Sequence, residues 1–272
     1  MSILFNRLTK NACNIVINRP AKRNALNLPM ICDLKSRLRE FEEDPSLTIA
    51  ILSGSGGNFC SGYDLNEIVN IDNGMPRLEQ IEKMLWPLDT QLSKKKITIA
   101  AIDGHAAGFG YELALKCDFR LAERDVRMGF LNRRFGIPIM NGGTVILPKL
   151  IGMARAMDLV ATGKAQLAPE ALQYGLIINY CDIGCVVGRS LNFGRSLVKF
   201  DQVPLLSDLK SMVDNDLEKD IELMGQERRR SLEYLQQCGP LTRAVKFLKG
   251  ELCRHGNFDL GNLVSTTPEV TL

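Results

Sequence analysis

The carboxylate Glu112 lies in an unusual setting, within the stretch "DGHAAGFGYELALKCD" at 103–118. Small residues and glycines precede it, and an apolar segment that reads as a short helix surrounds it. The first N–H groups of a helix have no internal acceptor, and the helix dipole favours negative charge beside them. A glycine-rich turn at such a point can bring these N–H groups close to a bound group, with the carboxylate as a proton carrier.

A second glycine-rich segment, "SGSGGNFCSGYDL" at 53–65, follows another apolar, strand-like run. If each segment contributes one backbone N–H group, the two groups can converge on one oxygen and stabilise negative charge there. The plainer alternative is that the glycines only permit tight turns and close helix packing. The residues alone leave both interpretations open.

Neither segment has a nucleotide-binding motif. Gly57 and Gly62 have the spacing of a phosphate loop, but Tyr63 and Asp64 follow where Lys and Ser or Thr are needed. The glycines at 104, 108 and 110 do not form G-x-G-x-x-G. The chain also has eight cysteines without a Cys-x-x-Cys pair and two histidines, so no metal site and no cofactor is expected.

The elements that must position these segments alternate along the chain. Four short runs rich in β-branched residues predict strands at 12–18, 48–54, 97–104 and 119–123, and apolar spacing predicts helices at 28–41, 77–92 and 109–117. This alternation is typical of an α/β fold with parallel strands. Beyond about residue 200 the pattern is charged and helical. We expect an α/β core over 1–200 and a helical C-terminal region over 201–272.

Composition is that of an ordinary globular protein, with 45% hydrophobic residues and a net charge of +3. Such a mild charge gives little support for nucleic-acid binding. The N-terminus lacks the layout of a signal peptide, the last residues are not the peroxisomal tripeptide, and no apolar run approaches a membrane span. We therefore expect a cytoplasmic protein that binds neither nucleic acid nor a membrane.

Five segments together resemble the crotonase superfamily, also called the enoyl-CoA hydratase/isomerase superfamily. They are "NRPAKRNALN" (18–27), "GGNFCSGYDLNEI" (56–68), "IDGHAAGFGYELALKCDFRLA" (102–122), "FGIPIMNGGTVILPKLIG" (135–152) and "ATGKAQLAPEALQYGLI" (161–177). The resemblance implies a spiral of ββα units and a homotrimer or hexamer. It also implies an acyl-CoA thioester substrate, with coenzyme A as part of that substrate, and a C-terminal region that serves trimerisation and covers the active site.

The resemblance also assigns roles to residues. It implies an oxyanion hole made by the N–H groups of Tyr63 and Phe109, with Glu112 as the acid/base and with their large side chains narrowing the acyl pocket. For Asp64, a helix-capping role is expected as well. The positions matching the family's CoA-binding segments are Arg23, Ala25, Cys60, Ser61, Asp64, Leu65, Asn66 and Gly108.

One matched position departs from the family pattern. Hydratases of this family use two glutamates, and counting back from the "NGGT" segment places Asn132 at the second. An amide can hold a water or a carbonyl but does not exchange a proton at neutral pH. Asn132 is kept as a candidate on that basis. Hydration, isomerisation and decarboxylation stay open, the last asking for one acid only. The neighbouring Arg133 and Arg134 are candidates for a substrate carboxylate, although adjacent residues do not both face one site. The alternative is a member that binds acyl-CoA without turnover.

Overall fold

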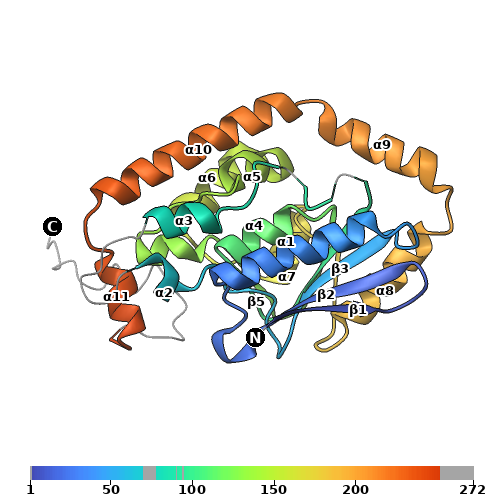
Figure 1. Ribbon diagram of the computed structural model, residues 1–272, viewed down its shortest axis with the longest axis horizontal. Helices are drawn as coiled ribbons and strands as arrows, with labels where there is room; N and C mark the ends of the chain where they lie inside the picture. The colour runs from blue at the N-terminus through green and yellow to red at the C-terminus, as the bar shows by residue number, and fades with distance from the viewer. Residues whose placement is uncertain (1, 70–77, 90, 94, 252–272) are drawn as a thin grey trace, which may run out of the picture.

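A computed structural model describes residues 2–69, 78–89, 91–93 and 95–251 of the chain (Figure 1). Within these residues the main sheet is six-stranded, in the order β1-β2-β3-β4-β6-β8. The first strand is antiparallel to the second, and every later pair is parallel. The strands are β1 (Ser2–Arg7), β2 (Ala12–Asn18), β3 (Ile49–Gly54), β4 (Ile97–Ile102), β6 (Phe119–Glu123) and β8 (Asn179–Cys181).

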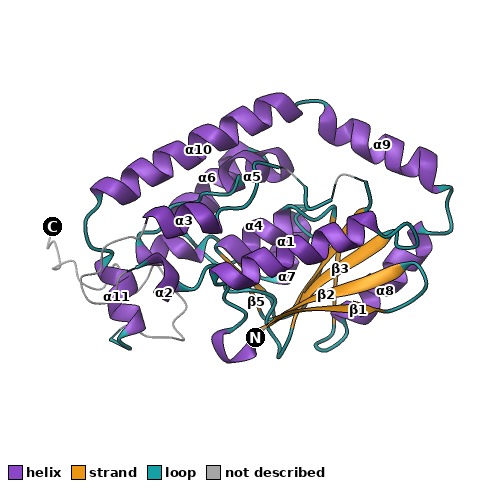
Figure 2. Cartoon of the chain, in the orientation of Figure 1, coloured by secondary structure: helices purple, strands orange, loops and turns teal. Residues whose placement is uncertain are grey.

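The parallel strands are apolar on both faces because helices cover both sides of the sheet (Figure 2). Helix α1 (Leu28–Glu43) begins at the N-cap Asn27, whose side chain accepts from the Met30 N–H, and packs its buried stripe on one face. Helix α8 (Val186–Leu197) packs on the other face. The predicted strands correspond to β2, β3, β4 and β6, and the helix predicted at 28–41 corresponds to α1.

A small second layer extends from the end of β4. Strand β5 (His105–Ala107) pairs in parallel with β7 (Arg127–Gly129), and helix α4 (Phe109–Leu115) follows β5 after one glycine. The helix predicted over 77–92 is shorter than expected, because α3 covers only Leu78–Met84 before a Pro87-containing turn. The remaining elements before residue 201 are η1 (Pro20–Lys22), α2 (Leu65–Ile68), η2 (Leu131–Phe135), α5 (Gly143–Ile151), α6 (Met153–Thr162) and α7 (Ala168–Gln173).

The described part of the C-terminal region is helical, as predicted. It contains α9 (Gln202–Asp214), α10 (Leu217–Gln237) and α11 (Thr242–Leu248). In Figure 1, α10 runs across α5, away from the strands, and α11 lies beside α2. Leucines of α9 pack against the apolar cluster on the α8 face of the sheet. No helix in the described ranges is long and apolar enough to cross a membrane.

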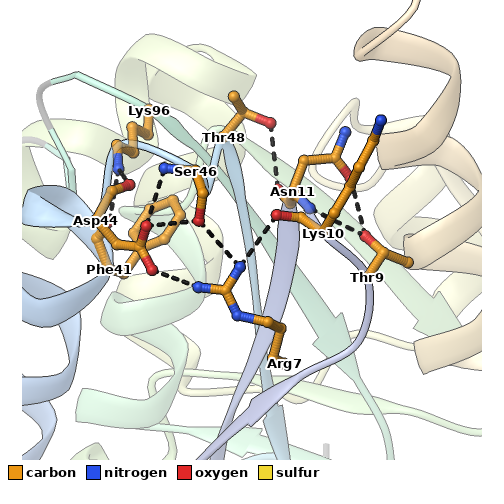
Figure 3. Close-up of polar contacts among 9 residues, drawn as sticks. All are labelled: Arg7, Thr9, Lys10, Asn11, Phe41, Asp44, Ser46, Thr48 and Lys96. Carbon is orange, nitrogen blue, oxygen red and sulfur yellow. Dashed lines mark hydrogen bonds and ion pairs between the residues drawn. The ribbon is translucent and has the colours of Figure 1, made fainter.

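The end of the sheet where β3 and β4 begin is held by a polar network (Figure 3). The Arg7 guanidinium pairs with Asp44 and donates to the Lys10 carbonyl and the Ser46 hydroxyl, both at 3.0 Å. Lys96 Nζ donates to the Phe41 carbonyl at 2.7 Å and to the Asp44 carbonyl, at the C-terminus of α1. These contacts tie β1, α1 and the start of β4 together at the end of the sheet opposite the glycine-rich segments.

Candidate active site

The two glycine-rich segments follow β3 and β4 and lie side by side. Cys60 donates its N–H to the His105 carbonyl and accepts from the Ala107 N–H, both at 2.9 Å. These bonds form a parallel bridge between Cys60 and Ala106, so the first segment extends the small sheet of β5 and β7. Gly110 is also pressed against this segment, since a Cβ there would lie 2.2 Å from the Cys60 carbonyl oxygen. Strand ends adjacent in a parallel sheet therefore bring both predicted loops to one place.

The end of the first glycine-rich segment lies beside the N-terminus of α4. The Leu26 N–H donates to the Gly62 carbonyl and the Asp64 N–H to the Leu26 carbonyl, both at 2.8 Å, so the Tyr63 N–H between them points away from Leu26. Phe109 is the first residue of α4, where the N–H has no acceptor within its own helix. A Cβ on Gly62 would lie 3.0 Å from the Phe109 nitrogen. The peptide that joins Gly62 to Tyr63 thus borders the start of α4.

Gly108 makes the turn into α4 possible. Its φ of 53° and ψ of −121° lie where side chains are disfavoured. Asn132, on η2, lies beside this glycine, at 3.5 Å from a Cβ built there. Its Nδ2 donates to the Ile137 carbonyl at 2.8 Å, and its buried Oδ1 has no hydrogen-bond partner within the described residues. Asn132 therefore lies beside the residue that precedes α4, and Glu112 lies in the first turn of that helix. These are the two side chains that were predicted to take part in the reaction.

Glu112 is buried, with 3% of its surface exposed. Its Oε1 accepts from the N–H groups of Asn141 and Gly143 at 2.9 and 3.0 Å, and its Oε2 accepts from Asn141 Nδ2 at 3.1 Å. Burial and the charge of Glu227 raise the pKa of Glu112 to about 7, although the Asn141 hydrogen bonds and Lys116 oppose this. A carboxylate accepts up to about four hydrogen bonds. Three are used, so Glu112 retains room for one more partner and is suited to exchange a proton near neutrality.

Two further charged groups near Glu112 were not singled out from the sequence. Lys116, one turn along α4, is 1% exposed and donates from Nζ to the Asp89 carbonyl. Burial lowers its pKa to about 8 against the opposing effect of Glu112. Glu227 comes from α10, and its carboxylate accepts from the N–H groups of Gly142 and Thr144 at 2.7 and 3.0 Å. Glu227 lies on the regularly spaced buried face of α10, and this spacing could have indicated from the sequence that it is buried. A glutamate within a charged helix does not, however, stand out from its neighbours.

Aromatic rings fill the space beside the two N–H groups. The Tyr63 and Phe109 rings are stacked, with centroids 4.4 Å apart and planes 14° apart, and the Trp86 ring lies 6.1 Å from that of Phe109. Asn141 Oδ1 accepts from the Tyr63 hydroxyl at 3.0 Å and from the backbone N–H of Trp86 at 2.9 Å. Burial raises the pKa of Tyr63 well above its ordinary value. Trp86 and Asn141 are thus site neighbours that the motifs did not reveal.

The predicted CoA-binding positions gather along the first loop and its neighbours. Ser61 donates its N–H to the Arg23 carbonyl at 3.0 Å, and Arg23 has the left-handed φ of 49°. Asp64 is the N-cap of α2, as predicted, and accepts from the Asn66 N–H at 3.1 Å. Leu65, the first residue of α2, is half-buried in the second apolar cluster.

A buried ion pair anchors this loop to the segment before α1. Arg19 Nη1 lies 2.5 Å from Asp64 Oδ2 and donates to the Ala25 carbonyl at 3.1 Å. Burial alone would raise the pKa of Asp64, but hydrogen bonds from Arg19 and Asn66 outweigh it and lower the pKa. Asp64 is therefore held as a charged structural group. The backbone groups of Cys60, by contrast, are taken up by β5.

Arg133 and Arg134 point in different directions. Arg133 is exposed and donates from Nε to the Val160 carbonyl at 3.3 Å, on the side of α6. Arg134 is half-buried, and burial together with the charge of Arg127 lowers its pKa. The two neighbours in η2 therefore differ in burial, with Arg134 the more buried of the two.

Two cavities of the described residues lie away from Glu112. One, of about 380 Å³, is lined by residues of α9 and the start of β4; the other, of about 460 Å³, lies between Leu28 and α3. Neither is lined by Tyr63, Phe109 or Glu112.

Comparisons with known proteins identify the family and the fold. Residues 7–237 match the family model described as enoyl-CoA hydratase/isomerase. The chain is similar to 1,2-epoxyphenylacetyl-CoA isomerase of Escherichia coli, with 30% identity over 244 residues that cover 86% of this chain and 93% of the relative. It is 34% identical to 2,3-dehydroadipyl-CoA hydratase of the same organism over 65% of this chain and 68% of the relative. The crystal structure of an enoyl-CoA hydratase from Mycobacterium tuberculosis superposes with a TM-score of 0.73 at 26% identity, covering 87% of this chain and 98% of that one.

Proposed function

Because the chain belongs to the enoyl-CoA hydratase/isomerase family, we propose that it forms the enolate of an acyl-CoA thioester with one glutamate as the acid/base. The observation that carries this proposal is the buried Glu112. Its pKa is raised to about 7, and it lies three residues beyond Phe109, whose N–H borders the Gly62–Tyr63 peptide. A carboxyl of this kind both accepts and returns protons at neutral pH.

In the proposed reaction, the N–H groups of Tyr63 and Phe109 donate to the thioester carbonyl oxygen. Glu112 removes a proton from the carbon next to that carbonyl, and the C–H electron pair becomes the C=C bond of an enolate. The negative charge moves to the oxygen, where the two N–H groups stabilise it; one such donor is typically worth about 3 kcal/mol. Return of the proton from Glu112 to carbon completes the cycle.

The single carboxyl favours some net reactions over others. Return of the proton to a different carbon gives an isomerisation, and loss of CO2 from a malonyl-type thioester gives the same enolate, which Glu112 then protonates. Hydration also needs a group that transfers a proton to or from water. Asn132 occupies the position matched to the second glutamate, and its amide orients water without exchanging a proton at neutral pH. We expect proton shift or decarboxylation to be faster than hydration.

Coenzyme A is proposed to bind along the first loop. The flank formed by the half-buried Arg23 and Ser61 and the exposed Asn66 offers backbone and side-chain groups for this binding. The other predicted positions on or near this loop are Ala25, Leu65 and Gly108. Asp64 contributes by holding this loop through Arg19 and α2. Cys60 contributes by joining it to β5, and burial raises the pKa of its thiol to about 12, so it is not a nucleophile.

The proposal is tested with purified protein and three thioester classes: α,β-enoyl-CoA, β,γ-enoyl-CoA and malonyl-type CoA. Turnover of the second or third class, abolished in Glu112→Gln, is the expected result. Full activity of Glu112→Gln on every class that the wild type converts would show that Glu112 is not the acid/base. Efficient hydration as the main activity would show that a second proton carrier acts beside it.

A second candidate, an acyl-CoA-binding member without turnover, is favoured by Asn132, an amide at the position matched to the second glutamate. Calorimetry with acyl-CoA esters separates the two candidates. Binding without conversion of any of the three classes supports this second function, whereas conversion excludes it.

We also propose that the protein assembles as a homotrimer or a hexamer of two trimers. Met153 and Met157 lie one helical turn apart on α6 and are 63% and 64% exposed, and Leu150 of α5 adds to this apolar face. Exposed apolar faces of this kind mark contact surfaces. Light scattering during size-exclusion chromatography is expected to give about three or six times the 30.3 kDa of one chain. A monomer would contradict this assembly.

A further inference from the structure

The carboxylates of Glu112 and Glu227 accept hydrogen bonds from the same turn. Residues 141–144 present four consecutive backbone N–H groups at the start of α5. The first and third donate to Glu112 Oε1 at 2.9 and 3.0 Å. The second donates to Glu227 Oε1 at 2.7 Å and the fourth to Glu227 Oε2 at 3.0 Å. The two acids therefore alternate along one turn, where the N–H groups lack helical acceptors and the dipole favours negative charge.

Both carboxylates are shielded from water. Glu227 is 7% exposed and Glu112 is 3% exposed. The second carboxylate at this turn disfavours the ionised form of Glu112. Glu227 also receives the Thr144 hydroxyl, so its oxygens accept three donors, one of them a side chain, like those of Glu112. The two carboxylates therefore accept the same number of hydrogen bonds. Only Glu112 lies on α4, the helix whose first N–H group belongs to the proposed oxyanion hole.

Helix α10 brings Glu227 to this position through one buried face. Its buried residues recur at helical spacing: Asp220, Met224, Glu227, Ser231 and Leu235. Asp220 pairs with Lys149 at 2.5 Å, and Ser231 donates to the Ile139 carbonyl at 2.8 Å. Met224 packs against Gly142, where a Cβ would lie 2.7 Å from its Cε. The C-terminal region is thus fastened to α5 on either side of Glu227.

We propose that Glu227 is a positioning residue for the reaction: it clamps the 141–144 turn that orients the Glu112 carboxylate, and its negative charge favours the protonated form of Glu112. This inference rests on the proposed role of Glu112 as the acid/base. It assigns to the C-terminal helical region a direct influence on the chemistry, because α10 supplies the charge that shapes proton transfer by α4.

The charged and titratable groups that face Glu112 act in both directions. Glu227 of α10 raises the pKa of Glu112, whereas Lys116 of α4 lowers it. Arg228, next to Glu227 on α10, and Tyr63, from the first loop, also interact electrostatically with Glu112. Neutralising Glu227 leaves Lys116, Arg228 and Tyr63 in place. The expected result is a fall in the pKa of Glu112, and with it a shift of the acidic limb of a base-dependent reaction to lower pH.

The test is an infrared titration of the full-length protein across the neutral range. The Glu112 band is assigned as the protonated-carboxyl absorption that disappears in Glu112→Gln, so no substrate is needed. Glu227→Gln is expected to lower its midpoint by roughly one pH unit, the size expected from removing one close like charge. Glu222→Gln, on the exposed side of α10, is the matched control and is expected to leave the midpoint unchanged. An unchanged midpoint in Glu227→Gln overturns the inference.

Glu227→Asp separates charge from clamping. It keeps the charge but shortens the reach to the turn, so the midpoint is expected to stay near that of the wild type. The kcat is expected to fall about tenfold, less than the 10²- to 10⁴-fold loss expected when the acid/base itself is removed. If Glu227→Gln does not fold, as judged by circular dichroism, Glu227→Asp decides alone, and wild-type kcat in that variant overturns the inference.

Failure of this inference and failure of the proposed function give different results. Turnover that is lost in Glu112→Gln, together with an unchanged midpoint in Glu227→Gln, leaves the proposed function standing and removes the role of Glu227. Turnover that persists in Glu112→Gln, together with a shifted midpoint, removes the proposed function and keeps the coupling of the two carboxylates.

Discussion

The two ends of the parallel sheet use carboxylates in opposite ways. At the end where β3 and β4 begin, Asp44 meets Arg7 and accepts from the Ser46 hydroxyl and N–H, and these hydrogen bonds lower its pKa (Figure 3). At the other end, Glu112 also accepts backbone N–H groups, yet its pKa rises to about 7. The partners are of similar kinds. The outcome differs because Asp44 remains in contact with water and Glu112 does not.

Exposure to water therefore separates carboxylates that stabilise the fold from carboxylates that can transfer protons. A solvated carboxylate keeps its charge, so it ties backbone segments together over a wide pH range. Burial destabilises the ionised form of a carboxylate, and a second carboxylate nearby destabilises it further. The protonated form of the buried group is therefore populated at neutral pH. The end of the sheet from which the glycine-rich loops emerge is therefore the end at which proton transfer is expected.

The difference between the two ends is tested most strongly by neutralising one carboxylate at each end and comparing the effects on kcat. Glu112→Gln is expected to reduce kcat by about 10²- to 10⁴-fold, because an amide cannot carry the proton. Asp44→Asn is expected to leave kcat within about twofold, since it lies outside the site and acts on stability. Steady-state kinetics on whichever thioester the wild type converts provide the measurement. Equal losses in the two variants would remove the distinction between the ends.

The next effect concerns the N–H of Phe109. Phe109→Pro removes that donor at the first position of α4, where proline is compatible with a helix. We expect kcat to fall about 10²- to 10³-fold, as for loss of one oxyanion donor. Phe109→Ala is the matched control, because it removes the ring and keeps the N–H. If the alanine variant loses as much kcat as the proline variant, the ring and not the N–H is what matters.

A smaller effect is expected in the pH dependence of stability. The pKa of Glu112 is raised from 4.5 to about 7, so the folded protein retains a proton that the unfolded chain has lost in this interval. The contribution of Glu112 to stability is thus present below about pH 4.5 and is lost as the pH rises through about 7, up to about 3 kcal/mol in total.

Urea unfolding of wild type and Glu112→Gln across this interval measures that contribution. The free energy of unfolding of the wild type, relative to the variant, is expected to fall as the pH rises. A difference that stays constant with pH would mean that Glu112 is ionised throughout, like Asp44. The comparison between the two ends of the sheet would then fail.

The smallest effect is expected at the end held by the polar network. Arg7→Ala removes an ion pair that is largely exposed, and such pairs contribute about 0.2–1 kcal/mol. The free energy of unfolding is expected to drop by that amount and to depend on salt, with kcat unchanged. A loss of kcat larger than about twofold, at equal folded fraction, would show that the two ends are coupled.

Much of the fold was predictable because strand and helix periods are local. Short-range sequence patterns predict the apolar strands β2, β3 and β4 and the buried stripe of α1. The structure has these elements at the predicted positions. The helix expected over 77–92 was too long, because apolar spacing continues past Met84 into a turn that contains Pro87. Propensity alone did not indicate where tertiary contacts end that helix.

The site was predictable in its backbone and not in its surroundings. Glycine spacing indicates where the backbone turns beside Glu112, whereas Tyr63 and Phe109 were assigned as N–H donors only through the family resemblance. Asn141, which bonds to Glu112 and to Tyr63, lies about thirty residues further on, and Glu227 lies more than a hundred residues beyond Glu112. Contacts over such separations depend on how α5 and α10 pack, which no local period reveals.

The central claim is that Glu112 removes a proton next to a thioester carbonyl while two N–H groups hold the oxygen. It is tested most directly by hydrogen exchange of a saturated acyl-CoA in D2O, followed by mass spectrometry, which needs no knowledge of the net reaction. The wild type is expected to incorporate deuterium next to the carbonyl, and Glu112→Gln is expected to do so at the uncatalysed rate. Exchange by Glu112→Gln at the wild-type rate, or binding of the ester by the wild type without exchange, would contradict the account.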